Sequence, residues 1–89
     1  MKAVITVIGK DSVGIMAKVS ALCAQHNVNI VDVSQSVLSD IFCMIMIGDI
    51  SKISTDFLAF SEKMSGLGDS IGMKIHVMHE DIFNSMHKV

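Results

Sequence analysis

The sequence contains no arginine, proline, tryptophan or tyrosine, and four phenylalanines are its only large aromatic side chains. The seven basic residues are therefore all lysines; they stand singly along the chain, and the formal net charge is −2. Proteins that bind nucleic acids use several clustered cations to contact phosphates and aromatic rings to stack on bases. Since the chain has neither feature, we predict no nucleic-acid partner.

Long apolar runs and cysteine motifs are also missing. No apolar run approaches the roughly 20 residues of a membrane-spanning helix, so we predict no membrane partner. Residues 1–7 alternate like a strand and lack the apolar core and cleavage site of a signal peptide. Cys23 and Cys43 have no Cys-x-x-Cys spacing and are interpreted as buried small hydrophobes in a reducing compartment. We therefore expect a cytoplasmic protein.

What the chain does contain is an excess of aliphatic side chains. Of its 89 residues, 51% are hydrophobic and 18% are charged, and eight are methionines. A chain of this length forms one domain and buries roughly two-thirds of its unfolded surface. The sequence thus predicts one ordered domain at residues 1–79, followed by a tail at residues 80–89.

The first half of the chain contains patterns typical of a strand, a helix and two further strands. They cover residues 3–8, 15–26, 30–38 and 41–47. Asp11 or Ser12 can provide the N-cap of the helix. Ser39 and Asp40 are a plausible two-residue turn between the last two strands. Because residues 30–38 carry polar insertions, we expect them to form an edge or interface strand.

The second half of the chain predicts a second helix and a fourth strand. The helix should begin near Ser54 and end at Gly66 or Gly68. Residues 73–78 alternate as a strand, and the tail at residues 80–89 has helical spacing. The resulting order, β-α-β-β-α-β, predicts an α+β, ferredoxin-like fold in which both longer helices cover one face of a four-stranded antiparallel sheet.

The two strands expected in the middle of this sheet, residues 3–8 and 41–47, are apolar on both faces. Two helices on one side leave the other apolar face uncovered. Exposed apolar patches larger than a few hundred Å² usually mark an interface. We therefore expect a homo-oligomer, at least a dimer, that buries either this face or the edge strand at residues 30–38.

The segment between the first strand and the first helix is the most polar stretch that lies directly between two apolar elements. It consists of Gly9, Lys10, Asp11, Ser12, Val13, Gly14 and Ile15. Backbone N–H groups at a helix start are free to bind a small anion. Gly14 either serves backbone geometry alone or allows a ligand to approach closely. Asp11 either caps the helix or pairs with an ammonium group.

These residues resemble the ACT domain family. The resemblance rests on the segment Gly9-Lys10-Asp11-Ser12-Val13-Gly14-Ile15, on Ala24-Gln25-His26 at the end of the first helix and on Asn27-Val28-Asn29-Ile30 at the second strand. It covers residues 3–79, and the chain is similar to small stand-alone bacterial ACT-domain proteins related to the ACT repeats of glycine-cleavage regulators. The resemblance implies binding of an amino acid or similar small ligand.

Carried over residue by residue, the resemblance implies a ligand site on the segment from Gly9 to Ile15 and on Asn29. Asn29 either caps the helix end or the strand turn, or donates its amide to the ligand; in the second case we expect the neighbouring subunit to supply it. The sequence departs from the family pattern at three positions. Val13 stands where many members have proline. Gly9 and Asp11 stand where serine-binding members have an imidazole and a carboxamide. The resemblance therefore leaves the identity of the ligand open.

Metal and catalytic chemistry find little support in the residues. His76 and His79 should point to different sides of a strand end, and Phe83 occupies the place of the second histidine in a His-Glu-x-x-His pattern. No Ser-His-Asp or Cys-His arrangement accompanies the signal for a cleft. We predict a regulatory module that senses a small ligand, without cofactor, metal or catalysis. The alternative is a ligand-free docking module for a protein partner.

Overall fold

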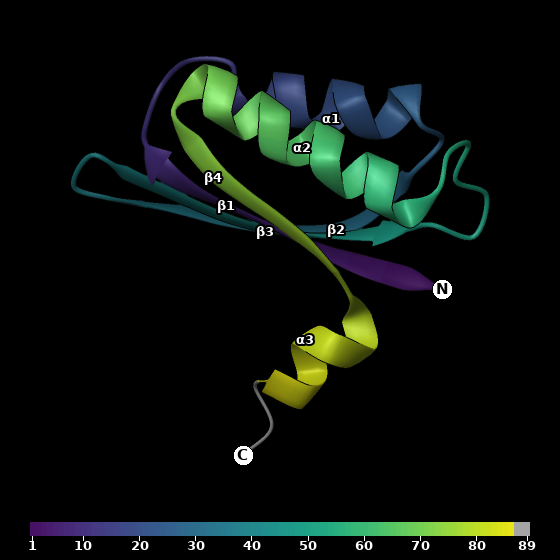
Figure 1. Cartoon of the computed structure of the whole chain (residues 1–89). Helices are drawn as coiled ribbons and strands as arrows, with labels where there is room; N and C mark the ends of the chain where they lie inside the picture. The colour runs from purple at the N-terminus through teal and green to yellow at the C-terminus, as the bar shows by residue number, and fades with distance from the viewer. Residues whose placement is uncertain (87–89) are drawn as a thin grey trace.

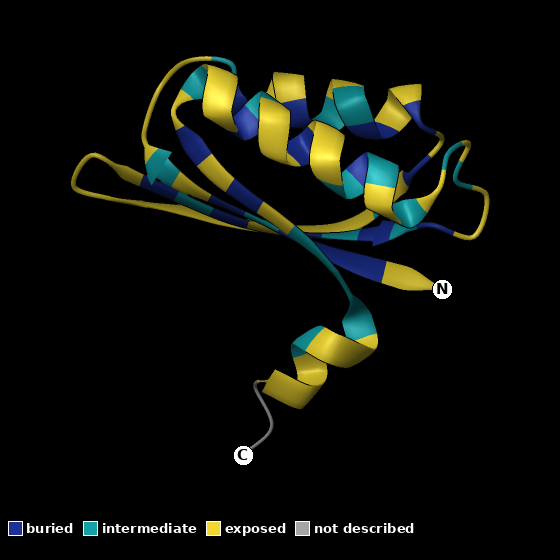
Figure 2. Cartoon of the chain, in the orientation of Figure 1, coloured by how far each residue is buried: buried dark blue, intermediate teal, exposed yellow. Residues whose placement is uncertain are grey.

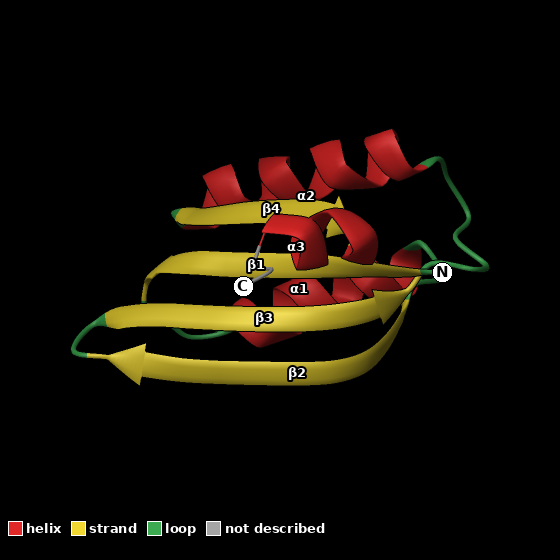
Figure 3. Cartoon of the chain, turned by 90° about the horizontal axis from the view of Figure 1, so that it is seen from below, coloured by secondary structure: helices red, strands yellow, loops and turns green. Residues whose placement is uncertain are grey.

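A computed structural model describes residues 1–86 and confirms the predicted fold (Figure 1). The elements are β1 (Lys2–Lys10), α1 (Ile15–Gln25), β2 (Asn29–Leu38), β3 (Ile41–Asp49), α2 (Phe57–Ile71), β4 (Met73–His79) and α3 (Glu80–Met86). The strands form one sheet in the order β2-β3-β1-β4, and every neighbouring pair is antiparallel. Helices α1 and α2 cover one face, and α3 lies on the other (Figures 1 and 3).

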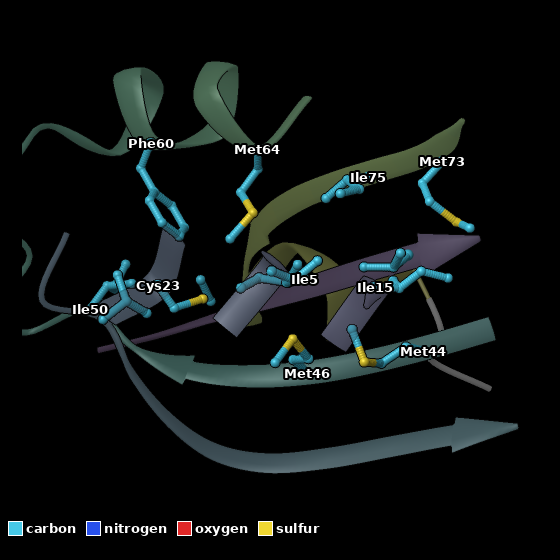
Figure 4. Close-up of a cluster of buried hydrophobic side chains, with 14 of the residues drawn as sticks. Ile5, Ile15, Cys23, Met44, Met46, Ile50, Phe60, Met64, Met73 and Ile75 are labelled. Carbon is cyan, nitrogen blue, oxygen red and sulfur yellow. The ribbon is translucent and has the colours of Figure 1, made fainter. Parts of the chain in front are cut away.

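The pairing of β1 with β3 confirms that the two apolar strands lie side by side. Ile5 is opposite Met46 and faces the helices, whereas Thr6 is opposite Ile45 and faces away from them. Side chains on the helix-facing side form a buried core with α1 and α2, which includes Ile5, Met46, Phe60 and Met64 (Figure 4). The sheet therefore has one face that α1 and α2 cover over β1, β3 and β4, and one face, called the open face below, that only α3 covers.

Strand β2 is the exposed edge of this sheet (Figures 2 and 3). Apart from the half-buried Ile30, every residue of β2 is exposed. The two-residue turn to β3 is confirmed, since Leu38 is opposite Ile41 and Ser39 adopts a left-handed φ of 59°. A bulge between Ile30 and Asp32 shifts the register. The free edge of β2 is available for pairing with another strand.

The ends of α2 differ from the prediction. The helix begins at Phe57, where the Asp56 carboxylate accepts a hydrogen bond of 2.7 Å from the N–H of Ala59. It continues through Gly66 and Gly68 and ends at Gly72, which has a left-handed φ of 73°. Gly68 is not a stop signal: a Cβ there would lie 2.6 Å from the Met73 carbonyl oxygen, so the glycine allows α2 to approach β4 closely.

The predicted helical tail begins at Glu80 and is helical through Met86. Residues 87–89 of that predicted tail lie outside the described residues. Helix α3 contacts β1 and β4 on the open face. Within residues 1–86, none of the helices combines the length and the hydropathy needed to cross a membrane.

Candidate functional site

The segment from Gly9 to Ile15 connects the end of β1 to the start of α1 on the molecular surface. The N–H of Asp11 donates a hydrogen bond of 2.7 Å to the carbonyl of Asp40, which ties this loop to the β2–β3 turn. The Lys10, Asp11, Ser12 and Val13 side chains are all exposed, and Val13 is fully so. The loop is therefore positioned by its backbone, and its side chains are free to contact a ligand.

Gly14 is the N-cap of α1, so the prediction that Asp11 or Ser12 caps this helix was wrong. Its backbone is left-handed, with φ 88°, and no side chain donates or accepts a capping hydrogen bond within the described chain. A side chain at Gly14 would find open space but a strained backbone, because L-residues other than glycine rarely adopt this φ. The first N–H groups of α1 are thus available to an anion from outside.

The two end residues of the loop, Gly9 and Ile15, are packed against the rest of the domain. Ile15 is 3% exposed and lies in the core (Figure 4). Gly9 faces β4: a Cβ there would lie 2.6 Å from Met73 Sδ and 2.7 Å from the Gly72 carbonyl oxygen. The absence of a side chain at Gly9, where serine-binding relatives have an imidazole, is therefore required by packing against the start of β4.

Asn29 lies at the opposite end of the sheet from this loop. It is paired with Asp49, which is paired with Lys2 at the start of β1, whereas Lys10 and Leu38 both pair with Ile41. Eight residue steps along β1 correspond to roughly 27 Å. Within one chain, the loop and Asn29 therefore do not form a common site.

The surroundings of Asn29 form a polar hollow that sequence reasoning missed. It has a volume of about 300 Å³ and is lined by Asn27, Asn29, Asp49, Ser51 and Lys52. The Asn27 side-chain amide donates a hydrogen bond of 2.8 Å to the Lys52 carbonyl. Hydrogen bonds from the Ser51 hydroxyl and N–H lower the pKa of Asp49 below its usual value. The signal in the sequence was that polar residues follow both the first helix and the third strand, two elements that end at the same end of the sheet.

Two histidines, His26 and His79, make ring contacts in this structure. His26 is nearly buried at the C-cap of α1, and its ring meets that of Phe60 edge-on at 6.0 Å. The His79 ring stacks on Phe57 at 4.1 Å. Among residues 1–86, no group of three His, Cys, Asp or Glu side chains is placed to hold a metal ion.

The two cysteines have different environments. Cys23 is completely buried in the core, and this burial raises the pKa of its thiol to about 11 (Figure 4). Cys43 is only half-buried, because β3 points it toward the open face. The prediction that both cysteines are buried is therefore confirmed for Cys23 and wrong for Cys43.

The strand order and the two helices on one face define a ferredoxin-like α+β domain. Comparison with protein families identifies it further: the model of the ACT domain matches residues 2–78. The chain belongs to the ACT domain family. ACT domains generally serve in small-ligand-sensing regulation, and the family is regulatory rather than catalytic.

Individual relatives agree with this assignment. The chain is 49% identical to a UPF0237 protein of Listeria monocytogenes over 89 residues, covering the whole of both chains. The solved ACT domain protein from Streptococcus pneumoniae is 38% identical, with 93% of each chain covered and a TM-score of 0.81. A structure assigned as a glycine cleavage system transcriptional repressor shares the fold at 24% identity and a TM-score of 0.73, with 86% of this chain and 44% of the other covered.

Proposed function

We propose that this protein is a regulatory sensor that binds an amino acid or similar zwitterion at the loop from Gly9 to Ile15 and at a subunit interface. The observation that carries the proposal is the start of α1, which has no side-chain cap within residues 1–86 and follows an exposed polar loop. Membership in the ACT domain family, which generally serves in small-ligand-sensing regulation, supports the same function.

The chemistry of the loop suits the two charges of an α-amino acid. The uncapped N–H groups of the first turn of α1 can donate to a carboxylate, and the partial positive charge of a helix N-terminus favours that anion without an arginine. The Asp11 carboxylate is exposed and is not used to cap the helix, so it is free to pair with the ammonium group. One ligand would thus contact both the N–H groups of α1 and the Asp11 carboxylate.

We propose that the neighbouring subunit completes the site. If β2 of two copies pair antiparallel along their free edges, the start of one β2 lies beside the end of the other. The end of β2 is the end where the loop lies, because Leu38, Ile41 and Lys10 are in register. Asn29 of the partner subunit would then reach the ligand, and the dimer would contain a continuous eight-stranded sheet.

A screen of the proteinogenic amino acids by thermal shift tests this function. A ligand at about 100 times its dissociation constant should stabilise the protein by roughly 2.7 kcal/mol, which is several degrees for a domain of this size. Calorimetry on the hits should give one site per chain. If no amino acid binds a folded oligomer at millimolar concentration, the sensing function is wrong and the docking module takes its place.

The cell compartment and the other partners are part of the same proposal. We place the protein in the cytoplasm, because Cys23 and Cys43 suit a reducing compartment. The lysine-only, net-acidic composition argues against nucleic acid as the regulated partner. The receiver of the signal would be a protein.

A further inference from the structure

The open face of the sheet is only half covered. Helix α3 contacts β1 and β4, whereas β3 and β2 extend beyond it (Figure 3). Between α3 and the sheet lies a hollow of about 300 Å³, and Ile8, Ile45, Met78 and Phe83 are among the side chains that line it. The helix therefore does not close the apolar face that the sequence predicts.

Large apolar side chains remain exposed on both sides of this hollow. On the sheet, Ile8, Ile41 and Ile45 are 51%, 48% and 42% exposed. On the helix, Ile82 and Met86 stand one turn apart and are 53% and 64% exposed. Two apolar surfaces of one chain, the β3 half of the sheet and the outer side of α3, thus lack a partner within residues 1–86.

We propose that a second copy of this chain covers the open face, with α3 of each copy packed over β3 of the other. A two-fold axis between the two sheets and parallel to the strands produces this arrangement. Because α3 lies over β1 and β4, the rotation places the partner's α3 over β3 and β2 of the first copy. Each uncovered surface then meets its complement, as a self-complementary two-fold interface requires.

The size of the face is sufficient for a stable dimer. Four strands spaced about 4.8 Å apart and about nine residues long give a face of roughly 19 by 30 Å, or about 550 Å² per copy. Two such faces bury about 1,100 Å², which exceeds the roughly 1,000 Å² expected of a specific interface. Where α3 covers the sheet, the apolar outer side of α3 takes the place of the sheet in the interface.

The charges on the open face agree with a second copy as the occupant. The outer strand β4 presents Lys74 and His76 on this face, since they pair with Ile8 and Thr6. The outer strand β2 presents Asp32, which pairs with Ile47. The proposed two-fold axis places β4 of one copy over β2 of the other and keeps the height along the strands. Met78 then lies over Asp32, and His76 and Lys74 lie over Ser34 and Ser36, so no two like charges of these strands meet.

The experiment is the molar mass in solution, measured by light scattering for the full chain and three variants. Ile45→Asp places a charge on the sheet side of the proposed interface, and Ile82→Asp places one on the helix side. Leu58→Asp is the matched control, because Leu58 is 67% exposed on α2, on the opposite side of the molecule. Circular dichroism verifies that each variant is folded.

We expect the wild type to have at least twice the mass of one chain, both interface variants to have a lower mass than the wild type, and Leu58→Asp to be unchanged. If the open face is the only interface, the variants are monomers; if the β2 edges also pair, the variants are edge-paired dimers and the wild type is larger than a dimer. The loss of mass therefore does not depend on the ligand-sensing proposal. A monomeric wild type, interface variants of full mass, or an equal loss in the control would each overturn the inference.

A cross-link tests the geometry directly. In the variant Ile82→Cys, the new thiol on α3 should lie near Cys43 of the partner subunit, which is half-buried on the open face. Mild oxidation should give a covalent dimer on a non-reducing gel, and adding Cys43→Ser should abolish it. A link that forms only within one chain, or no link at all, would contradict the crossed arrangement.

Discussion

At the scale of single residues, the start of α1 depends on a glycine backbone and leaves its neighbouring carboxylate unused. Gly14 caps the helix through its left-handed conformation, and Asp11 contributes only its N–H, which binds Asp40. Sequence reasoning could find the loop but had no means of choosing between a capping and a binding role for Asp11. The structure removes the capping role.

This difference gives a prediction for Asp11→Asn. Since the side chain caps nothing, the free energy of unfolding should change by less than about 0.5 kcal/mol, the usual range for surface substitutions. Amino-acid binding should weaken by about 1.5 to 3 kcal/mol, the scale of a hydrogen bond to a charged group. Denaturant titration and calorimetry measure the two effects. Equal binding by Asp11→Asn would exclude a salt link between Asp11 and the ligand.

Asp49 provides a prediction on pH. Its hydrogen bonds from Ser51 lower the pKa of the carboxyl in the folded state below the ordinary 3.8. A lowered carboxyl pKa means that this group stabilises the fold above pH 3.8, and that the contribution is lost as the pH falls through the folded-state pKa. In an NMR titration, Ser51→Ala should raise the pKa of Asp49 toward 3.8. An unchanged pKa of Asp49 would show that the Ser51 hydroxyl is not a cause of the shift.

At the scale of the elements, hydrophobic periodicity predicts most of this fold. The pattern of alternating and helically spaced apolar residues located all four strands and both main helices, because burial on one or two faces determines where apolar residues must stand. The limits of α2 were wrong for a physical reason. Glycine marks helix ends and close approaches alike, and only the position of β4 shows that Gly68 belongs to the second kind.

The two glycines of α2 provide a matched pair of substitutions. Gly68→Ala should destabilise the protein by about 1 to 3 kcal/mol, because the added methyl would overlap the Met73 carbonyl and force α2 away from β4. Gly66→Ala should stabilise it by roughly 0.5 to 1 kcal/mol, because Gly66 is exposed in the same helix with nothing near the added group. Chemical denaturation measures both. Similar effects of the two substitutions would contradict the close approach.

At the scale of the whole molecule, the candidate site is divided between the two ends of the sheet. The loop lies at the end of β1 and the polar hollow with Asn29 at its start. Sequence alone could name the loop residues and Asn29, but neither the polar hollow around Asn29 nor the separation of the two, since these depend on which strands pair and in which direction. In the proposed dimer, an antiparallel pair of β2 edges would join them across two chains, and the open face would be a second, separate contact.

The central claim, that one ligand contacts the loop of one chain and Asn29 of another, is tested most directly by mixing two defective proteins. Asp11→Ala should impair the loop, and Asn29→Ala should weaken binding by about 1 kcal/mol, or about five-fold. Each variant alone should lack sites of wild-type affinity.

When equal amounts are unfolded and refolded together, half of the β2-paired dimers should contain one chain of each kind. Each of these has one intact site, so calorimetry with an amino acid that binds the wild type should detect wild-type affinity at about a quarter of the sites. Size-exclusion chromatography of differently tagged chains verifies the mixing. If mixed dimers form and no site recovers wild-type affinity, the two residues do not act across the subunits and the account is contradicted.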